Sequence, residues 1–460
     1  MYIEQLYTNC LAEAAYYIES EGEAAIIDPI RETQPYIELS KKRGSTIKYI
    51  FETHFHADFI SGHLDLSRKT GAPIIYGPMA ETKYRVRNAV DGEIFQLGKL
   101  KIKVLHTPGH TPESSSYLLI DETGKDYAIF TGDTLFVGDV GRPDLLDGVM
   151  SREELAGLLY DSLDKKIKPL ADDVILYPGH GPGSACGKNI GKETMSTIGD
   201  QKKFNYALKD MSREQFIEEV TAGIQPPPKY FFEDARINKH GYESIDEVVE
   251  KNSQPLSIDE FKKEIVNGAL IVDSRTADDF EKGFISGSIN LGLNGQYAIW
   301  AGTLIDIHQS IVLVTKEGEE RNSVLRLARV GFENVKGYLQ DGIHSWKENL
   351  ETVRSIAAKD MKLEIEKGCE IMDVRKPGEW ALAHVKGATF LPLAEMPNNL
   401  KGLDKNKSYI VHCGGGYRSM TAISIMKRKG FTNLINVYGG FSSIQNAGVE
   451  IVTEEEMVNR

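Results

Sequence analysis

The chain has 460 residues, 41% of them hydrophobic and 26% charged, a composition typical of a soluble globular protein. This length exceeds what one hydrophobic core supports and indicates roughly three domains. With 54 basic and 67 acidic residues, the net charge is −13. Because no basic stripe is present to neutralise phosphates, the sequence argues against a nucleic-acid partner, whereas small anionic substrates remain compatible with local arginines and backbone amides.

The four cysteines are widely spaced, at Cys10, Cys186, Cys369 and Cys413. Without CxxC pairs they form neither a disulfide framework nor a zinc ribbon, and they suit a reducing compartment. The first residues, "MYIEQLYTNCLAEAAYYIE", are acidic where a signal peptide requires basic residues and an apolar core. No apolar run approaches the length of a membrane span. We therefore expect a cytoplasmic protein without membrane association.

Short apolar runs in the first half predict buried strands separated by histidine- and glycine-rich turns. The five runs are 24–30, 47–54, 101–107, 126–133 and 173–180. Four of them lead to a loop that contains histidine or aspartate, and enzymes built on sheets gather ligands at strand ends in this way. A helix is predicted over 151–167, because Ser151 is a favourable N-cap and Glu154 completes a capping box. The segment "QPPPKY" (225–230) predicts the start of a linker.

The second half of the chain contains an internal repeat. The segment "IVDSRTADDFEKGFISGSINL" (271–291) matches "IMDVRKPGEWALAHVKGATFL" (371–391) with an offset of 100 residues. The Asp-x-Arg motif at 273–275 accordingly recurs at 373–375. Both copies alternate strand, loop and helix, which predicts two tandem α/β domains of about 100 residues with parallel sheets.

Histidines and aspartates in the first half form a candidate metal site. The candidate ligands are His54, His56, Asp58, His63, His106, His110, Asp133 and His180. All except His63 lie in the motifs "THFHADF", "HTPGH", "TGD" and "PGHG", which occur in order at the ends of predicted strands. A single histidine is usually a surface or core residue, but coincidence is a poor account of so many in these positions.

These motifs resemble those of the metallo-β-lactamase fold, and the resemblance covers about residues 1–235. Within that fold the segments "HTPGHTPES", "FTGDTLFVGDVGRPDL" and "LYPGHG" are most similar to those of the persulfide dioxygenases. The resemblance implies an αββα sandwich with a mononuclear Fe(II) centre. It also implies that His54, His110 and Asp133 bind the iron, with water completing the coordination.

Phe59 follows Asp58 where two-metal members of this fold have a histidine that helps to hold a second metal. Since phenylalanine cannot bind a metal, one donor of that second site is missing. By the same resemblance His56 is not a direct ligand, while Asp58 and His180 are expected to support the ligands or contact substrate. Persulfide dioxygenases generally keep a histidine at this position, so Phe59 departs from that family too.

Two histidines and one carboxylate on one face, with open positions opposite, suit ferrous iron and dioxygen, although the same donors would also bind zinc. The resemblance favours iron. Arg142, supported by Asp144, is a candidate for binding the anionic end of the substrate, and Tyr177 for donating to a metal-bound group; both could instead be structural. Cys186 is either a small buried residue or a thiol that relays sulfur near the iron.

A second motif, "SYIVHCGGGYRSMTAISIMKRKG" (408–430), predicts a strand, a glycine-rich loop and a helix. The strand leads to Cys413, and the glycines allow backbone N–H groups to turn toward its sulfur. The helix N-terminus should favour the thiolate and hence a nucleophilic sulfur. The residues predicted to surround a bound anion are Gly414, Gly415, Gly416, Tyr417, Arg418 and Ser419.

The spacing Cys-x-x-x-x-Arg, preceded by "DVRKPGEW" and "AHVKGA", resembles the rhodanese family, with the domain expected over 357–460. Related phosphatases have a loop one residue longer, so the resemblance implies sulfur transfer through Cys413. In the middle repeat, expected over 254–352, Thr315 stands at the position of Cys413 and three glutamates follow within 317–320. We therefore predict that this rhodanese-like domain is inactive, and that it packs the active domains together or mediates homo-oligomerisation.

Together the resemblances imply a persulfide dioxygenase fused to an inactive and an active rhodanese domain. At the iron, a low-molecular-weight thiol persulfide and O2 would give sulfite and thiol. At Cys413, persulfide sulfur would pass to sulfite and give thiosulfate, or the reverse. Two alternatives stay open: a zinc-dependent thioester hydrolase of the glyoxalase II type, and a sulfur sensor or carrier that consumes no oxygen.

Overall fold

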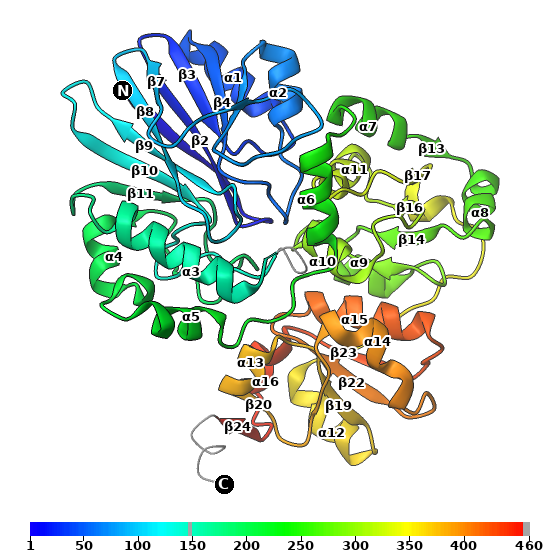
Figure 1. Cartoon of the computed structure of the whole chain (residues 1–460). Helices are drawn as coiled ribbons and strands as arrows, with labels where there is room; N and C mark the ends of the chain where they lie inside the picture. The colour runs from blue at the N-terminus through cyan, green and yellow to red at the C-terminus, as the bar shows by residue number, and fades with distance from the viewer. Residues whose placement is uncertain (146–149, 454–460) are drawn as a thin grey trace. The chain divides into compact units, whose positions relative to one another are not determined.

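The computed structural model describes residues 1–145 and 150–453 (Figure 1). The chain divides into two compact units, each with its own sheets. The first unit comprises Met1–Val248 and Ala328–Gly331, and the second comprises Val249–Leu327 and Phe332–Arg460.

Two six-stranded sheets form the centre of the first unit. One sheet has the order β1 (Tyr2–Thr8), β2 (Glu13–Ser20), β3 (Glu23–Ile27), β4 (Thr46–Glu52), β5 (Ile74–Tyr76) and β6 (Arg87–Asn88). The other has the order β12 (Ser196–Thr197), β11 (Ile175–Pro178), β10 (Asp126–Gly132), β9 (Ser115–Ile120), β8 (Leu100–His106) and β7 (Ile94–Leu97). All five runs predicted to be strands are therefore strands, with ends shifted by at most three residues.

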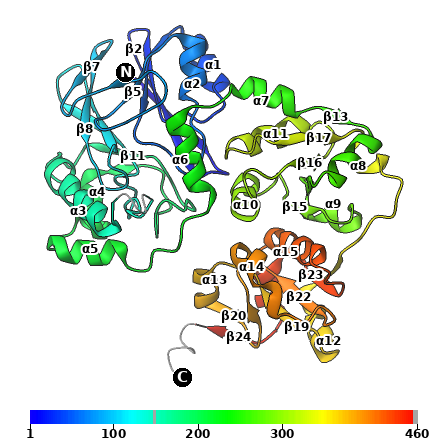
Figure 2. The ribbon, with the colours of Figure 1, turned by 45° about the vertical axis from the view of Figure 1, so that its right-hand side comes forward.

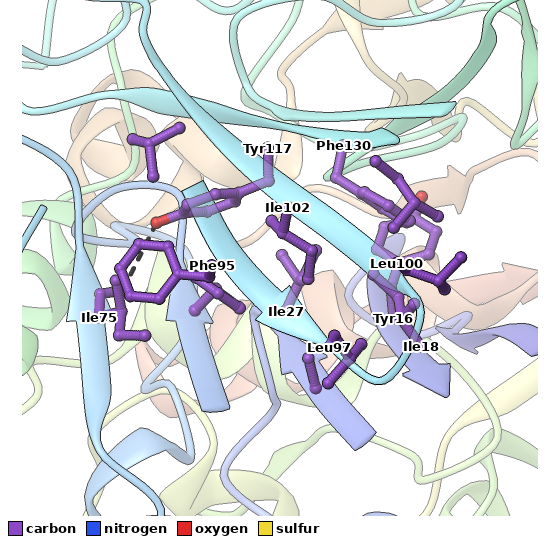
Figure 3. Close-up of a cluster of buried hydrophobic side chains, with 14 of the residues drawn as sticks. Tyr16, Ile18, Ile27, Ile75, Phe95, Leu97, Leu100, Ile102, Tyr117 and Phe130 are labelled. Carbon is purple, nitrogen blue, oxygen red and sulfur yellow. Dashed lines mark hydrogen bonds between the residues drawn. The ribbon is translucent and has the colours of Figure 1, made fainter. Parts of the chain in front are cut away.

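The inner faces of these two sheets share one hydrophobic core (Figure 3). Tyr16 from the first sheet packs edge-on against Phe130 from the second, with ring centroids 4.9 Å apart. Phe51 and Tyr117 also meet across the core, with tilted rings whose centroids are 4.7 Å apart. Because alternate residues of each strand point inward, these apolar side chains fix the register of both sheets.

Helices cover the outer faces of the sandwich. Two helices, α1 (Gln34–Arg43) and α2 (His63–Thr70), pack against β4. On the second sheet, a separate apolar cluster joins the strands to α3 (Arg152–Ser162), α4 (Ile198–Phe204) and α5 (Arg213–Thr221). The predicted capping box is present: Ser151 accepts from the backbone of Glu154, whose side chain accepts from Ser151 in return. The helix continues as a π turn over Leu163–Ile167, so the predicted end at 167 is confirmed.

The proline-rich segment does not end the first unit. No helix or strand covers 224–228, as predicted, but α6 (Tyr230–His240) then packs back onto the loop after β4, and α7 (Ile245–Asn252) follows. In α6, buried Asn238 donates to the carbonyls of His56 and Phe59, both at 2.8 Å. The contacts of this unit thus extend past residue 235, while the domain bounds given above stay predictions.

The second unit contains two sheets with the same topology, as the internal repeat predicts. The first has the order β13 (Pro255–Leu256), β17 (Val335–Leu339), β16 (Ile311–Val314), β14 (Leu270–Asp273) and β15 (Ile289–Asn290). The second has the order β18 (Arg354–Ile356), β23 (Leu434–Val437), β22 (Tyr409–His412), β19 (Glu370–Asp373) and β21 (Thr389–Phe390). All neighbouring strands in these two sheets are parallel, also as predicted. A small antiparallel pair, β20 (Ala383–Val385) with β24 (Ile451–Thr453), lies beside the second sheet.

The helices of the second unit follow its strands in alternation (Figure 2). The first copy contains α8 (Ile258–Val266), α9 (Ala277–Lys282), α10 (Tyr297–Leu304) and α11 (Glu320–Ala328). The second copy contains α12 (Met361–Glu366), α13 (Pro377–Leu382), α14 (Met396–Asn399), α15 (Tyr417–Arg428) and α16 (Gly440–Gln445). None of the helices in the described part of the chain has the length and apolar character needed to cross a membrane.

Candidate metal centre and candidate sulfur-transfer site

Three side chains of the first unit meet in a buried cluster, at the ends of β4, β8 and β10. His54, His110 and Asp133 are each at most 2% exposed, and their candidate ligand atoms lie within 4.8 Å of one another. The Oδ2 atom of Asp133 lies 3.5 Å from Nε2 of His110 and 3.9 Å from Nε2 of His54. Within the described residues, Nε2 of His110 and Oδ2 of Asp133 have no hydrogen-bond partner. Buried polar atoms are rarely left unpaired, so their convergence fits a bound cation.

Hydrogen bonds fix both histidines in the tautomer that can bind a metal. His110 donates from Nδ1 to the carbonyl of Arg142 at 2.8 Å, which leaves the Nε2 lone pair free. The Thr53 hydroxyl donates its proton to Asp28, so it can only accept from Nδ1 of His54, 2.9 Å away. Burial, together with neighbouring His56, lowers the pKa of His54 well below its ordinary value, so the ring is neutral.

The carboxylate of this cluster is ionised. Burial opposes ionisation of Asp133, but His180 and His54 outweigh it and lower the pKa of that carboxyl. Two neutral imidazoles and one carboxylate are donors that suit ferrous iron or zinc. The residues present therefore fit one divalent metal ion.

His180 lies between two carboxylates. Its Nδ1 is 2.8 Å from Oδ1 of Asp133, and its Nε2 is 2.8 Å from Oδ2 of Asp58. Burial alone would lower the pKa of His180, but the two carboxylates outweigh it and raise that pKa well above its ordinary value. Both ring nitrogens therefore donate to carboxylates in this arrangement, and His180 also forms a cluster with Asp58 and Cys186, whose ligand atoms lie within 4.8 Å of one another.

Phe59 and His56 lie in the loop after β4 and contact one another. The Phe59 ring is 1% exposed and packs against the His56 ring, with centroids 4.4 Å apart. His56 directs Nε2 toward Oδ1 of Asp28 at 3.2 Å and Oε2 of Glu52 at 3.6 Å. His56 thus lies between apolar contact with Phe59 and two buried carboxylates near its Nε2 atom.

The sulfur-transfer loop lies in the second unit, between β22 and α15. Cys413 is 1% exposed, and its sulfur accepts a hydrogen bond from the backbone N–H of Gly416 at 3.1 Å. The hydroxyl of Ser419 lies 3.6 Å from the same sulfur. Arg418, at the first turn of α15, forms a bidentate ion pair with Glu379 at 2.5 and 2.7 Å. An N–H donor and a helix N-terminus thus lie at one thiol, and Arg418 belongs to the first turn of that helix; the anion-binding role of these residues stays a prediction.

Comparisons with known proteins identify the families of both domains. The Metallo-beta-lactamase superfamily model matches residues 8–180, and the Rhodanese-like domain model matches residues 257–349 and 357–447. Human mitochondrial persulfide dioxygenase ETHE1 is 30% identical over 198 residues, which are 43% of this chain and 70% of that protein. This protein belongs to the metallo-β-lactamase superfamily, in the fusion of an ETHE1-like domain with rhodanese-like domains. The predicted fold class is thereby confirmed.

A solved structure described as a metallo-beta-lactamase from Staphylococcus aureus subsp. aureus COL is 31% identical, with a TM-score of 0.65. The alignment covers 74% of this chain and 99% of that one, so it extends well beyond the ETHE1-like domain. A hydroxyacylglutathione hydrolase from Brucella anthropi is 41% identical over 143 residues, 30% of this chain. The chain spans about half the length of the hydroxyacylglutathione hydrolases that it matches.

Other predicted residues of the ETHE1-like domain have structural contacts. The Arg142 guanidinium donates four hydrogen bonds, two to Asp144 and one each to the carbonyls of Ala185 and Gln225, so the domain occupies four of its five N–H groups. Its own carbonyl is the one that accepts from His110.

The Tyr177 ring is turned into the sandwich core. It stacks on Phe130 at 5.1 Å and packs against Tyr16 at 5.2 Å, as part of the apolar cluster between the two sheets. Cys186, by contrast, lies beside the metal cluster: its sulfur is within 4.8 Å of ligand atoms of Asp58 and His180. Burial, and the nearby Asp58 charge, raise the pKa of that thiol well above its ordinary value.

The remaining candidate histidines have other surroundings. His106 directs Nε2 to the carbonyl of Pro112 at 2.8 Å. His63 is fully buried among the rings of Tyr76, Tyr84 and Tyr242. Asn238 is the supporting residue that the sequence did not reveal, since its contacts join segments about 180 residues apart.

The middle rhodanese-like domain has a carboxylate in the loop that corresponds to the loop of Cys413. Thr315 replaces the cysteine, and Oε1 of Glu320 accepts from the backbone N–H of Gly318 at 3.1 Å. The Thr315 hydroxyl is 3.5 Å from the same oxygen. The N–H donor of this loop is therefore already occupied by the chain's own carboxylate, and the inactivity of this domain stays a prediction.

Proposed function

We propose that this protein is an iron-dependent persulfide dioxygenase coupled to a sulfurtransferase. The observation that carries the first activity is the convergence of unpaired Nε2 of His110 and Oδ2 of Asp133 with His54 in a buried cluster. Similarity to the human protein named persulfide dioxygenase favours iron over zinc. The net reaction is RSSH + O2 + H2O giving RSH + SO3²⁻ + 2H⁺.

The chain's own residues have defined tasks in this proposal. His54, His110 and Asp133 would hold the iron, and ferrous iron bound there would supply the dioxygen chemistry that side chains lack. The carbonyl of Arg142 orients His110, and the imidazolium of His180 holds Asp133 in place.

Other residues near the cluster are assigned weaker roles. Asp58 and Cys186 lie next to the cluster and are proposed to contact the substrate sulfur. Arg142 and Tyr177, which the sequence suggested as direct participants, are proposed to act through the residues that they pack against.

Sulfur transfer is assigned to the C-terminal domain. Persulfide sulfur on Cys413 would be attacked by sulfite: the sulfur–sulfur bond to the enzyme breaks, thiosulfate leaves, and the cysteine thiolate is regenerated. The Gly416 N–H would stabilise the thiolate, while Arg418 and the N–H groups of the glycines would offset the charge of the anion. Sulfite from the first reaction is thus consumed by the second.

A second candidate function is thioester hydrolysis, because the hydroxyacylglutathione hydrolases match the first domain. Phe59, which cannot bind a second metal, and the attached rhodanese-like domains, which have no evident task in a thioesterase, oppose it. Oxygen uptake by the ferrous-loaded protein with glutathione persulfide or coenzyme A persulfide tests the proposal, with sulfite and thiosulfate quantified. Uptake with thiosulfate as product supports it, whereas hydrolysis of a glutathione thioester without oxygen uptake would replace it.

The remaining proposals concern location and assembly. All four cysteines are free thiols, which is compatible with the reducing cytoplasm. Assembly into a homo-oligomer stays a prediction, and size-exclusion chromatography with light scattering tests it.

A further inference from the structure

The catalytic loop of the active rhodanese-like domain is followed at once by Tyr417, the first residue of α15. Its hydroxyl donates at 3.0 Å to the carbonyl of Gly292, which belongs to the inactive copy. Its ring lies over Gly295 of the same copy: a Cβ atom added there would be 2.4 Å from Cε2 of Tyr417. Such a distance is not tolerated between carbon atoms, so the tyrosine occupies space that only glycine leaves open.

Hydrogen bonds within the inactive copy fix the segment 292–295, which contacts Tyr417. The backbone N–H of Gly295 donates to the carbonyl of Gly292, which closes a turn. Arg326 of α11 donates to the carbonyls of Leu293 and Gly295. Thus the carbonyl of Gly292 is directed to Tyr417, while the two other carbonyls are occupied by Arg326.

The two copies differ at the two glycine positions that contact Tyr417. With the offset of 100 residues, Gly292 corresponds to Pro392 and Gly295 to Glu395, whereas Leu291 and Leu391 are identical. The glycines therefore do not belong to the shared pattern of the repeat. They lie where the inactive copy meets the tyrosine.

The contact continues along one face of α15. Thr421, Ser424 and Arg428 follow Tyr417 at helical spacing, and Oγ of Ser424 accepts from the backbone N–H of Asn290 at 3.0 Å. The Arg428 guanidinium donates to the carbonyl of Gly287. Several hydrogen bonds thus fix the position of α15 against the edge of the inactive copy, beginning at the residue next to the catalytic loop.

We infer that the inactive copy positions the catalytic loop of the active copy by holding Tyr417 against Gly292 and Gly295. This inference rests on the sulfur-transfer function proposed above. Gly416, which donates to the sulfur of Cys413, is bonded directly to Tyr417, and Arg418 follows it. Displacement of the tyrosine therefore moves both groups that face the anion. Tyr417 is a positioning residue here, with its hydroxyl already occupied by Gly292.

Gly295→Ala is the test, because the backbone of Gly295 lies outside the left-handed region and accepts alanine without strain. We expect kcat/KM for sulfur transfer from thiosulfate to fall about tenfold, because displacement of reacting groups by even 1 Å costs rate. Alkylation of Cys413 by iodoacetamide, followed by peptide mass spectrometry across pH, should slow and shift to higher pH. Oxygen uptake should not change. Gly402→Ala is the matched control, since nothing lies within 4 Å of the added Cβ there.

A comparison of single and double variants separates loss of the contact between Tyr417 and Gly295 from general destabilisation of the domain. In a Tyr417→Ala chain no ring remains to meet the new Cβ, so adding Gly295→Ala should change neither readout further. An equal loss from Gly295→Ala in both backgrounds, or no loss in either, would overturn the inference. Tyr417→Phe removes only the hydrogen bond to Gly292 and should give a smaller loss of sulfur transfer. This variant replaces Gly295→Ala if that variant fails to fold. Unchanged KM, kcat and alkylation rate in Tyr417→Phe would count against the inference. If the unsubstituted chain transfers no sulfur, the proposed function fails, but the alkylation comparison still tests whether the contact of Tyr417 with Gly292 and Gly295 positions the loop.

Discussion

Glu379 holds Arg418 by two hydrogen bonds, from Nη1 at 2.5 Å and from Nη2 at 2.7 Å. This ion pair fixes the guanidinium beside Gly414 of the loop that contains Cys413, where a Cβ atom added to the glycine would be 3.0 Å from Nη2 of Arg418. Burial tends to raise the pKa of the Glu379 carboxyl, but hydrogen bonds from Arg418 outweigh it and lower that pKa. The arginine is therefore fixed before an anion arrives, which reduces the entropy lost on binding.

Arg418→Lys should raise KM for thiosulfate about tenfold, because lysine cannot reproduce two parallel charge-assisted hydrogen bonds. Steady-state kinetics of thiosulfate:cyanide sulfurtransfer measure this. Glu379→Gln keeps the side-chain length and leaves Arg418 present, so its effect should be smaller. A larger loss from Glu379→Gln than from Arg418→Lys would contradict the assignment.

Cys413→Ser should abolish sulfur transfer while leaving oxygen uptake with persulfide largely intact, since the nucleophile and the metal cluster lie in separate domains. Sulfite should then accumulate in place of thiosulfate. Cys369→Ser, in the same domain but away from the loop, is the matched control and should behave as the unsubstituted chain. Continued thiosulfate formation by Cys413→Ser would remove Cys413 from the mechanism.

His110→Ala should lose bound iron and all oxygenase activity, because one of the three converging ligands is removed. Elemental analysis of protein purified with ferrous iron measures the metal directly, independently of turnover. His106→Ala is the control, since the ring of His106 bonds to a backbone carbonyl outside the cluster. Full iron occupancy in His110→Ala would mean that the ligand set is different.

Asn238→Asp should weaken both stability and iron retention. The amide of Asn238 donates to the carbonyls of His56 and Phe59 and accepts from the N–H of Ser61. A carboxylate cannot donate, so two buried carbonyls would lose their partner, at a cost of about 1–3 kcal/mol each. Thermal unfolding with and without iron measures the effect. Unchanged melting and unchanged iron content would show that the loop does not depend on α6.

His63 should make the folded protein less stable at acid pH. Burial, and the charges of His56 and Arg68, lower the pKa of His63 to about 3, against about 6.5 in the unfolded chain. Between these values the unfolded state binds more protons than the folded state, so the free energy of unfolding falls as pH falls. The slope from this residue reaches about 1.4 kcal/mol per pH unit.

Urea unfolding at pH 7.5, 6 and 5 checks this dependence. His63→Gln removes the titrating group and should flatten the decline between pH 6 and 5. The exposed His240 offers the control, because His240→Gln should leave the decline unchanged. An identical pH dependence in His63→Gln would show that other groups cause it.

Local patterns in the sequence determined much of this molecule. Apolar runs such as 47–54 specify a buried strand by their own composition, and Ser151 with Glu154 specifies a helix start within three residues. The loop from Cys413 to Arg418 needs glycine, cysteine and arginine at short spacing, which is why its form could be predicted. The internal repeat likewise fixed the shared topology of the last two sheets.

The tertiary structure decided which partners these residues take. Nothing in the sequence near Asp58 shows that it bonds to His180, or that Tyr177 turns into the sandwich core instead of toward the metal cluster. Asn238 and Tyr417 each act on a segment more than a hundred residues away. The physical reason is that secondary structure depends on neighbours in the chain, whereas hydrogen-bond partners and buried charges depend on distances that exist only after folding.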